Sequence, residues 1–379
     1  MKVIVLGAGR VGSAIALDLA GEEGFQVRVA DISEPAVARL AGRGVAGVQA
    51  DLSDAAAVRD LAAAADLVVG AVPGAMGFAT VQAVLEVPRP VVDISFFPED
   101  PFLLDNGALK AGVPVAVDCG IAPGFSNMFL GHMETVLERV DHFACYVGGL
   151  PVERTLPWEY KAPFSPADVI EEYTRPARYV SQGVQVTMPA LSEPELLEFP
   201  GIGTLEAFNT DGLRTLLRTS RVPSMVEKTM RYPGHIDRIR LLRDLGFFSM
   251  VPVDVGGMSL RPRDLTARLL FPAWELGPSQ EDLTIMRLVA EGVQGGRPVR
   301  ITYNLLDRYD RTTGTTSMAR TTGFTCTAVV RLLARGLWAT AGVAAPEAIG
   351  RQRECFAFTR AELASRGVVF SERTEPLRG

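Results

Sequence analysis

The 379-residue sequence is poor in the side chains that build metal and redox sites, with four cysteines and three histidines. The cysteines, Cys119, Cys145, Cys326 and Cys355, are widely separated, and none forms a C-x-x-C pair or has a histidine at ligand spacing. We therefore expect no metal site. We interpret Cys119 as a small buried thiol without a catalytic role.

The sequence also lacks a basic stripe and a long apolar run. Its net charge is -6, with both signs interspersed, which argues against a nucleic-acid partner. No apolar run approaches the ~20 residues that span a bilayer, and the apolar run 3–6 is too short for a signal peptide. We expect a cytoplasmic protein without a membrane partner.

The first third of the chain alternates short β-branched runs with alanine-rich stretches, the pattern of a parallel sheet covered by helices. The predicted strands are 2–6, 26–30, 47–50, 67–71, 90–94 and 113–118. The predicted helices are 12–21, 35–43, 54–65, 78–86 and 101–111. The fold class is therefore α/β, a Rossmann-type doubly wound parallel sheet with a second, mixed α+β domain.

Chain length and a change of texture predict the domain boundaries. A chain of 379 residues is long enough for two domains. After Pro123-Gly124 the predicted strands become longer and the sequence becomes richer in arginine and proline. We predict a dinucleotide-binding domain at 1–122 and a substrate and dimerisation domain at 123–316. The predicted helix 317–335 is apolar on more than one face, so 317–379 should return to the first domain. Strand pairing between subunits would make a homodimer or a higher homo-oligomer.

The glycine-rich loop 7–12 lies between the first predicted strand and the first predicted helix. In this G-x-G-x-x-G pattern Gly7 allows the tight turn, Gly9 lets a pyrophosphate approach the backbone, and Gly12 lets the helix lie close to the strand. Arg10 and Val11 complete the loop. The free amides at the helix start can then bind the pyrophosphate of a dinucleotide.

The end of the second predicted strand indicates which dinucleotide binds. Asp31, followed by Ile32, lies about twenty residues beyond the loop, where a carboxylate accepts hydrogen bonds from the adenosine ribose and repels a 2′-phosphate. The cofactor we predict is NAD. Asp31 as an ordinary turn residue is the alternative, and Arg10 and Arg28 leave some tolerance of NADP open.

Three further strand ends should complete the cofactor pocket, since ligands of open α/β sheets lie beyond the carboxyl ends of the strands. The residues concerned are Asp51 and Leu52 for the adenine, Ala71, Val72 and Pro73 for the nicotinamide ribose, and Asp93 and Ser95 after the fifth strand. Ordinary loop chemistry is the alternative reading of these small and polar residues.

Several segments along nearly the whole chain resemble the saccharopine dehydrogenase-like family, and most closely its lysine 6-dehydrogenases. They are VPGAMGF (72–78), VDISFFPE (92–99), DCGIAPGFSN (118–127), YVGGLP (146–151), IEEYTRPAR (170–178), DGLR (211–214), RYPGH (231–235) and RTTGF (320–324). Each string alone is unspecific, but their order and spacing together are typical of this family.

The resemblance implies an enzyme that deaminates the ε-amino group of L-lysine oxidatively with NAD. The product would be 2-aminoadipate 6-semialdehyde, which cyclises to a piperideine carboxylate. A saccharopine-type reductase acting on a secondary amine is the nearest alternative enzyme, and a dinucleotide-binding regulator without turnover is the alternative from another class. The exact amino acid, the base and the strictness for NAD stay open at this point.

Such a reaction needs a proton acceptor, for which the sequence offers three candidates. Asp118 follows the sixth strand and should face the ligand, although it could equally cap the next element. His235 follows Pro233-Gly234, and it is the histidine we favour for proton transfer. Lys161 could replace it if burial lowers its pKa.

The amino acid head of the substrate needs a cation for its carboxylate and an acceptor for its ammonium. Arginine forks suit the carboxylate, and the resembling segments hold Arg175, Arg178, Arg214 and Arg231. Asp211 is the candidate acceptor for the α-ammonium. A solvated surface arginine and a simple Asp-Gly turn are the alternatives for these positions.

Overall fold

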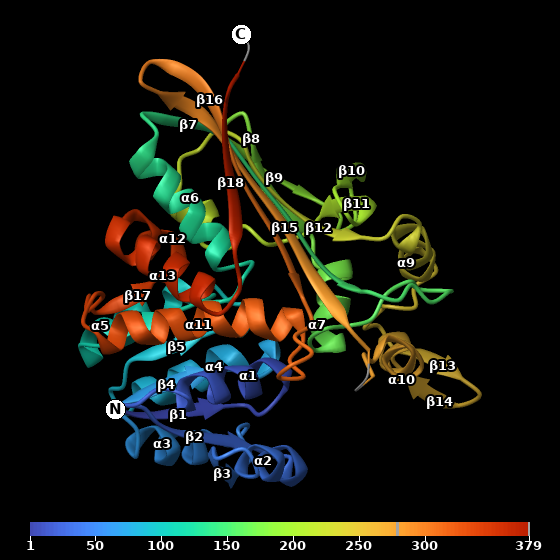
Figure 1. The fold of residues 1–379 in the computed structure, drawn as a ribbon. Coiled ribbons are helices and arrows are strands. Elements are labelled where there is room, and N and C mark those ends of the chain that lie inside the picture. The colour runs from blue at the N-terminus through green and yellow to red at the C-terminus, as the bar shows by residue number, and fades with distance from the viewer. Residues whose placement is uncertain (278–279, 378–379) are drawn as a thin grey trace.

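The protein is described by a computed structural model that covers residues 1–277 and 280–377. A seven-stranded sheet, parallel throughout, forms its first layer, in the order β17-β6-β5-β4-β1-β2-β3. The strands of the chain's first third are β1 (Lys2–Leu6), β2 (Gln26–Asp31), β3 (Ala46–Gln49), β4 (Leu67–Gly70), β5 (Val91–Asp93) and β6 (Pro114–Ala116). The predicted Rossmann-type doubly wound sheet is therefore confirmed (Figure 1).

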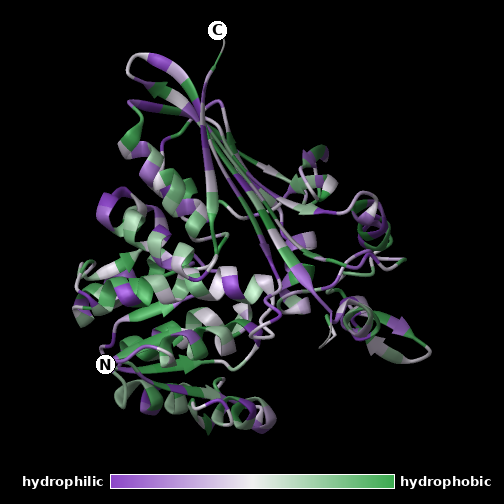
Figure 2. Ribbon diagram, viewed as in Figure 1, coloured by the Kyte–Doolittle hydropathy of each residue, from purple (hydrophilic) through white to green (hydrophobic). Residues whose placement is uncertain are grey.

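Helices cover both faces of this sheet. They are α1 (Arg10–Ala20), α2 (Glu34–Ala41), α3 (Ala55–Ala63), α4 (Gly74–Leu85) and α5 (Asp105–Ala111), with a 3-10 turn at Pro101–Leu104. Because both faces are covered, strands such as β4 are buried along their whole length and consist almost entirely of apolar residues (Figure 2). Side-chain caps begin two of the helices: Ser33 accepts from the amide of Ala36, and Asp54 from that of Ala56.

A nine-stranded mixed sheet forms the second layer, with the main order β10-β11-β12-β7-β15-β16-β18. Its strands are β7 (Arg139–Pro151), β8 (Ala177–Ser181), β9 (Val184–Met188), β10 (Glu195–Phe199), β11 (Gly203–Asn209), β12 (Met225–Arg231), β15 (Asp282–Gln294), β16 (Arg297–Arg308) and β18 (Phe370–Pro376). At its centre β7 pairs parallel with β12 and antiparallel with β15. The second, mixed α+β part of the fold prediction is thus confirmed.

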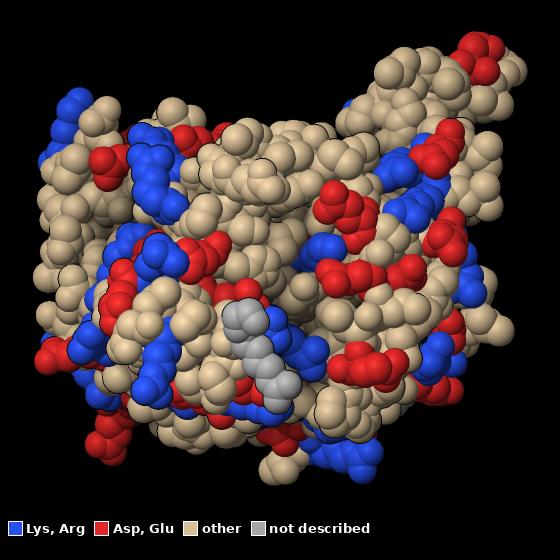
Figure 3. All heavy atoms as spheres, turned by 90° about the horizontal axis from the view of Figure 1, so that it is seen from above, with Lys and Arg blue, Asp and Glu red and all other residues tan. Residues whose placement is uncertain are grey.

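Five helices and a hairpin accompany the second sheet. They are α6 (Phe125–Val136), α7 (Pro166–Thr174), α8 (Leu216–Thr219), α9 (His235–Asp244), α10 (Pro262–Trp274), β13 (Val253–Val255) and β14 (Met258–Leu260). The hairpin β13–β14 pairs only with itself and all six of its strand residues are exposed. It lies at the far right of Figure 1, where Figure 3 shows a projection with few charged side chains.

The C-terminal part contributes to both layers. It comprises α11 (Ser317–Ala334), β17 (Gly342–Ala344), α12 (Pro346–Arg351), α13 (Arg353–Ser365) and β18. The helix α11 packs on α1, and β17 extends the first sheet beside β6, whereas β18 pairs with β16 of the second sheet. The predicted boundaries of the two domains remain a prediction. No helix in the described part of the chain is long and apolar enough to cross a membrane.

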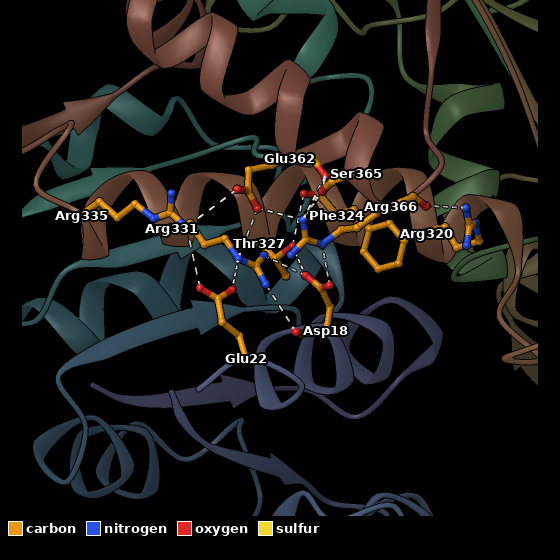
Figure 4. A network of polar contacts seen from close by, with 10 residues as sticks. All are labelled: Asp18, Glu22, Arg320, Phe324, Thr327, Arg331, Arg335, Glu362, Ser365 and Arg366. Atoms are coloured by element: carbon orange, nitrogen blue, oxygen red, sulfur yellow. Dashed lines mark hydrogen bonds and ion pairs between the residues drawn. The ribbon is translucent and has the colours of Figure 1, made fainter. Parts of the chain in front are cut away.

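A buried ion network, here called the α1–α11 network, fastens the C-terminal part to the first sheet (Figure 4). The guanidinium of Arg331 is 1% exposed and lies 2.8 Å from Asp18 and 2.6 Å from Glu22, both on α1. Arg366, just beyond α13, pairs with Asp18 at 2.6 Å and with Glu362 at 2.8 Å. Each charged side chain named here therefore has an oppositely charged partner within the α1–α11 network.

Candidate active site

A cleft of about 830 Å³ lies beyond the carboxyl ends of the first sheet's strands and is lined by residues of both layers. Of the predicted cofactor residues, those lining it are Gly7, Gly9, Arg10, Val11, Gly12, Asp31, Ile32, Asp51, Leu52, Ala71, Val72, Pro73 and Ser95. Of the predicted substrate residues, those lining it are Arg175, Asp211 and Arg231. The structure thus brings both sets to one cavity, and their roles stay predictions.

The glycine loop has the shape that a pyrophosphate requires. A Cβ on Gly12 would lie 2.1 Å from the carbonyl oxygen of Gly7, so the helix α1 can approach the turn only with glycine there. Gly9, in contrast, has open space where a Cβ would be. It is the N-cap residue of α1, and no side chain caps the first amides of the helix. The first amides of α1 therefore remain available to an anion, which fits a dinucleotide.

Two carboxylates mark the adenosine end of the cleft. Asp31 ends β2 and accepts from the amide of Ala8 at 2.6 Å and from that of Ser33 at 2.8 Å. Asp51 lies at the neighbouring strand end, where hydrogen bonds from the hydroxyl and amide of Ser53 lower its pKa. Both carboxylates line the cleft in the place where a ribose is expected.

Asp93 lies behind the cleft wall and supports it. Its side chain is fully buried, and one carboxylate oxygen accepts from the amide of Ser95 at 2.9 Å and from its hydroxyl at 2.6 Å. Burial raises the pKa of Asp93 to about 8. The structure therefore places Ser95 at the cavity surface and Asp93 one layer beneath it.

Arg175 lies at the substrate end with spare hydrogen-bonding capacity. Its guanidinium lies 4.6 Å from the ring centroid of Phe96, and Glu171 is 4.0 Å away. Among the described residues, its buried Nη1 atom has no hydrogen-bond partner. Burial and the nearby Arg214 guanidinium lower the pKa of Arg175. A buried cation of this kind is satisfied by an incoming carboxylate.

Arg231 is held by a chain of buried polar groups. It lies 2.9 Å from Glu172 and donates to the Tyr173 hydroxyl at 3.1 Å. Tyr173 in turn contacts Nε2 of His235 at 2.9 Å, and Nδ1 of His235 donates to the carbonyl of Trp158 at 2.9 Å. Burial lowers the pKa of His235 to about 3, so the imidazole is neutral and both of its nitrogens are engaged.

Two of the predicted proton acceptors lie outside the cleft. His235 is fully buried behind Arg231, where it orients Tyr173 and does not reach the cavity. Lys161 donates to the carbonyl of Ala273 at 2.9 Å, away from the cavity lining. The structure therefore does not bring the predicted proton acceptors His235 and Lys161 to the place where substrate could bind.

Asp118 and Arg214 form a pair with each other instead of presenting their charges to the cavity. Two hydrogen bonds of 3.2 Å join the guanidinium to the carboxylate, and Arg214 also donates to the carbonyl of Phe97 at 2.8 Å. Both have a left-handed backbone, with φ of 51° and 52°. Such strained residues persist where the surroundings hold them, and here the pair fastens the end of β6 to the second layer.

Sequence reasoning missed several polar residues that line the substrate end. They are Asp168, Glu171, Glu172, Thr210, Glu227 and Thr229. For Glu227 and Thr229 the available signal was the run of polar residues in β12, a strand that is buried except at Val226. That signal indicates buried polar side chains, but it does not say which face of the strand meets a cavity.

Comparison with known proteins gives two family models that together cover most of the chain. The model described as "Saccharopine dehydrogenase NADP binding domain" matches residues 3–120. The model described as "Saccharopine dehydrogenase C-terminal domain" matches residues 120–368. The boundary between the two models coincides with the end of the β6 segment, where the chain passes into the second layer.

The individual relatives that match this chain have low sequence identity to it. The saccharopine dehydrogenase [NADP(+), L-glutamate-forming] of Pyricularia oryzae is 27% identical over 271 residues, which are 65% of this chain and 58% of that protein. The chain thus matches little more than half the length of this relative. The carboxyaminopropylagmatine dehydrogenase of Synechocystis is 22% identical over 370 residues, 90% of this chain and 91% of that protein.

A solved structure shares the fold along the full chain. It is the apo saccharopine dehydrogenase (L-Glu forming) of Saccharomyces cerevisiae, with a TM-score of 0.79 and 18% identity, covering 99% of each chain. Similarity at this level of identity establishes the common fold. The arrangement of the two sheets is therefore shared with that protein.

Proposed function

This chain belongs to the saccharopine dehydrogenase family, and from that premise we propose that it is an NAD-dependent oxidoreductase that removes the ε-amino group of L-lysine. The products would be 2-aminoadipate 6-semialdehyde, ammonium and NADH. The observation that carries the proposal is the charge of the substrate end of the cleft. Among the described residues lining that end, the carboxylates are Asp168, Glu171, Glu172, Asp211 and Glu227, and the arginines are Arg175 and Arg231.

This surplus of carboxylates favours a cationic substrate. Lysine carries one carboxylate and two ammonium groups, whereas saccharopine carries three carboxylates and two amines. Several of the acidic groups are already balanced, since Glu172 pairs with Arg231 and Asp211 pairs with Arg178 at 2.8 Å. Glu171 likewise pairs with Arg263 at 2.5 Å. Asp168 and Glu227 have no ion-pair partner among the described residues, so the ammonium groups of lysine would supply the missing cations, whereas the three carboxylates of saccharopine would add negative charge beside them.

The α-carboxylate of lysine finds a matching group in the cleft. Arg175, whose Nη1 lacks a partner among the described residues, would hold the α-carboxylate. The far end of the cavity would receive the side-chain amine beside the nicotinamide. The bound dinucleotide would supply the hydride acceptor, while the residues of this chain bind and orient the amine.

The choice of NAD rests on Asp31. Its carboxylate lies at the end of β2, held by the amides of Ala8 and Ser33 at 2.6 and 2.8 Å. Bringing a 2′-phosphate beside this carboxylate would set two negative groups against each other. The matching family model is described as NADP binding, so the preference for NAD belongs to our proposal and needs a direct test.

The first experiment follows absorbance at the NADH band with purified protein and L-lysine, L-ornithine, saccharopine or diaminopimelate, each with NAD and with NADP. We expect turnover with lysine and NAD. Turnover confined to saccharopine would replace the proposal with a saccharopine reductase. Silence across the panel, with dinucleotide binding intact by calorimetry, would overturn the enzymatic proposal and favour a dinucleotide-binding regulator.

A further inference from the structure

Glu227 is a buried carboxylate in the wall of the cleft. Its residue is 6% exposed, and it lies in β12, where alternate side chains point to opposite faces of the sheet. Thr229 and Arg231 share its face and line the same cavity. Lys228 points to the other face, where it lies 2.7 Å from Glu195. The neighbouring lysine therefore does not neutralise Glu227.

Two hydroxyl groups hold the Glu227 carboxylate. Thr210 donates to its Oε2 atom at 2.5 Å, and the Oγ1 atoms of Thr210 and Thr229 are 2.9 Å apart. Since a threonine hydroxyl has one proton, Thr210 must accept from Thr229 while it donates to Glu227. The result is a directed chain of hydrogen bonds, from Thr229 through Thr210, that stabilises the ionised carboxylate.

A glycine gives the carboxyl group its place. A Cβ on Gly212 would lie 2.3 Å from Oε2 of Glu227 and 2.4 Å from its Cδ, closer than any real contact. The carboxyl group therefore rests directly against the backbone of residue 212. This packing fixes both the position of the group and the direction in which its oxygens meet the cavity.

The surroundings supply Glu227 with donors but with no countercharge. None of the described arginines, lysines or histidines forms an ion pair with it, and the charged neighbours that act on it are Glu172 and Asp211. The Cys145 thiol packs against it from β7, and burial raises the pKa of that thiol well above its ordinary value. Burial raises the pKa of Glu227 itself to about 8. A buried carboxylate without a cation is stabilised by a cationic ligand.

We propose that Glu227 binds the substrate ammonium that reacts and accepts its proton, with Thr210 and Thr229 positioning the carboxylate. This inference rests on the proposed function, an oxidation of a primary amine. Glu172 lies nearby in the same cavity, but Arg231 already neutralises it at 2.9 Å. Glu227 is therefore the carboxylate at this end that combines burial, a fixed position and a missing countercharge.

The proton transfer is simple to balance. One proton leaves the alkylammonium nitrogen and bonds to a carboxylate oxygen of Glu227, which leaves a neutral amine and a neutral carboxylic acid. The free electron pair on the amine nitrogen then assists loss of hydride from the adjacent carbon. A proton acceptor that titrates near the working pH serves this purpose better than an ordinary glutamate, which is a far weaker base.

Glu227→Gln tests the proposal, because glutamine keeps the shape and removes the charge. We expect kcat/KM for lysine to fall by about 10²- to 10⁴-fold. In the wild-type protein kcat/KM should rise with pH through about 8, as Glu227 ionises, and this limb should vanish from the residual activity of the variant. Glu195→Gln is the matched control, since Glu195 pairs with Lys228 on the opposite face and should leave kcat/KM unchanged.

A binding measurement tests the same residue without turnover. Calorimetric titration with n-butylammonium at pH 9, in the presence of NAD, should show binding to the wild type and at least tenfold weaker binding to Glu227→Gln. Equal affinity in both proteins, or no binding to either, would overturn the role of Glu227. Wild-type turnover of lysine with an unchanged Glu227→Gln variant would do so as well. Absence of turnover alongside charge-dependent amine binding would instead count against the proposed function alone.

Discussion

Two buried clusters of charge in this protein differ in one respect, the completeness of their pairing. In the α1–α11 network, Arg331 has Asp18 at 2.8 Å, Glu22 at 2.6 Å and Glu362 at 3.4 Å (Figure 4). At the substrate end of the cleft, Glu227 has hydroxyl donors without a cation, and the Nη1 atom of Arg175 has no partner among the described residues.

The difference separates structural charges from charges that await a ligand. Burying an ion is costly, so a cluster whose charges all have partners within the chain serves the fold itself. A cluster that holds an unpaired carboxylate and an unpaired guanidinium is complementary to a molecule that carries an ammonium and a carboxylate. The following predictions test this distinction.

Among the variants that test this comparison beyond Glu227→Gln, Gly212→Ala should have the largest effect. The added methyl group would lie 2.3 Å from Oε2 of Glu227, so the carboxyl group must move. We expect kcat/KM for lysine to fall by about 10²-fold, because a displacement of about 1 Å in a catalytic group costs this much. Gly42→Ala is the control, since its Cβ would meet nothing closer than 3.6 Å. Full activity in Gly212→Ala would contradict the argument from packing.

Removing a charge from the α1–α11 network should lower stability without changing catalysis. Arg331→Met would take from Asp18 and Glu22 the buried guanidinium that they share and leave Asp18 with Arg366 at 2.6 Å, and we expect the free energy of unfolding to fall by about 2 kcal/mol. The measurement is chemical denaturation, with KM for lysine unchanged. Arg335→Met is the matched control on the same helix.

The guanidinium of Arg335 is 52% exposed and lies 3.8 Å from Glu22, so its loss should change the free energy of unfolding by less than about 0.5 kcal/mol. If both variants lowered the free energy of unfolding equally, burial would not explain the contribution of Arg331 to stability. If Arg331→Met raised KM instead, the network would belong to the site and the comparison would fail.

Removing the guanidinium of Arg175 should weaken substrate binding and leave stability unchanged. Arg175→Met would leave the substrate carboxylate without its donor, and we expect KM for lysine to rise by about 10- to 100-fold with kcat within a few-fold. Its melting temperature should stay close to that of the wild type. Arg218→Met, whose guanidinium is 65% exposed, provides the surface control. A loss of stability with unchanged KM would make Arg175 a structural residue.

The last prediction concerns a difference in stability that depends on pH. The folded protein raises the pKa of Glu227 from its ordinary 4.5 to about 8, so the folded state holds a proton that the unfolded state has released. The contribution of this group to stability is therefore complete below about pH 4.5 and is lost as pH rises through about 8.

Denaturation of the wild type and of Glu227→Gln across this range isolates the effect, because the other buried carboxyl with a similar pKa, Asp93, titrates in both proteins. We expect the wild type to lose stability relative to the variant between these two pH values. A difference that stays constant with pH would mean that Glu227 does not titrate there.

Local sequence features predicted the first half of the molecule well. The strands and helices of the parallel sheet follow from short apolar runs bounded by glycine turns and capping residues, all close together in the chain. The glycine loop is equally local, since Gly7 and Gly12 are five residues apart and their contact is what the turn requires. For this reason the cofactor residues predicted at the strand ends line one cavity, except Asp93, which lies beneath Ser95.

The substrate end could not be predicted in the same way, because distant segments build it. Asp118 has a position after β6 that suits a ligand group, yet Arg214, far along the chain, takes up its charge. His235 has a suitable context after a glycine turn, yet the fold buries it completely behind Tyr173. Neither outcome follows from the neighbours of these residues in the sequence.

Contiguous residues and the order of short motifs specify the dinucleotide loop, the doubly wound sheet and the family, so the amino-acid sequence was enough to predict them. Which charges meet the cavity depends on the folded chain. Glu227 faces it because β12 lies beside β7, and Thr210 and Gly212 come close because the chain turns between β11 and β12. Burial, pairing and pKa are properties of such assembled surroundings, and they exist only once the chain has folded.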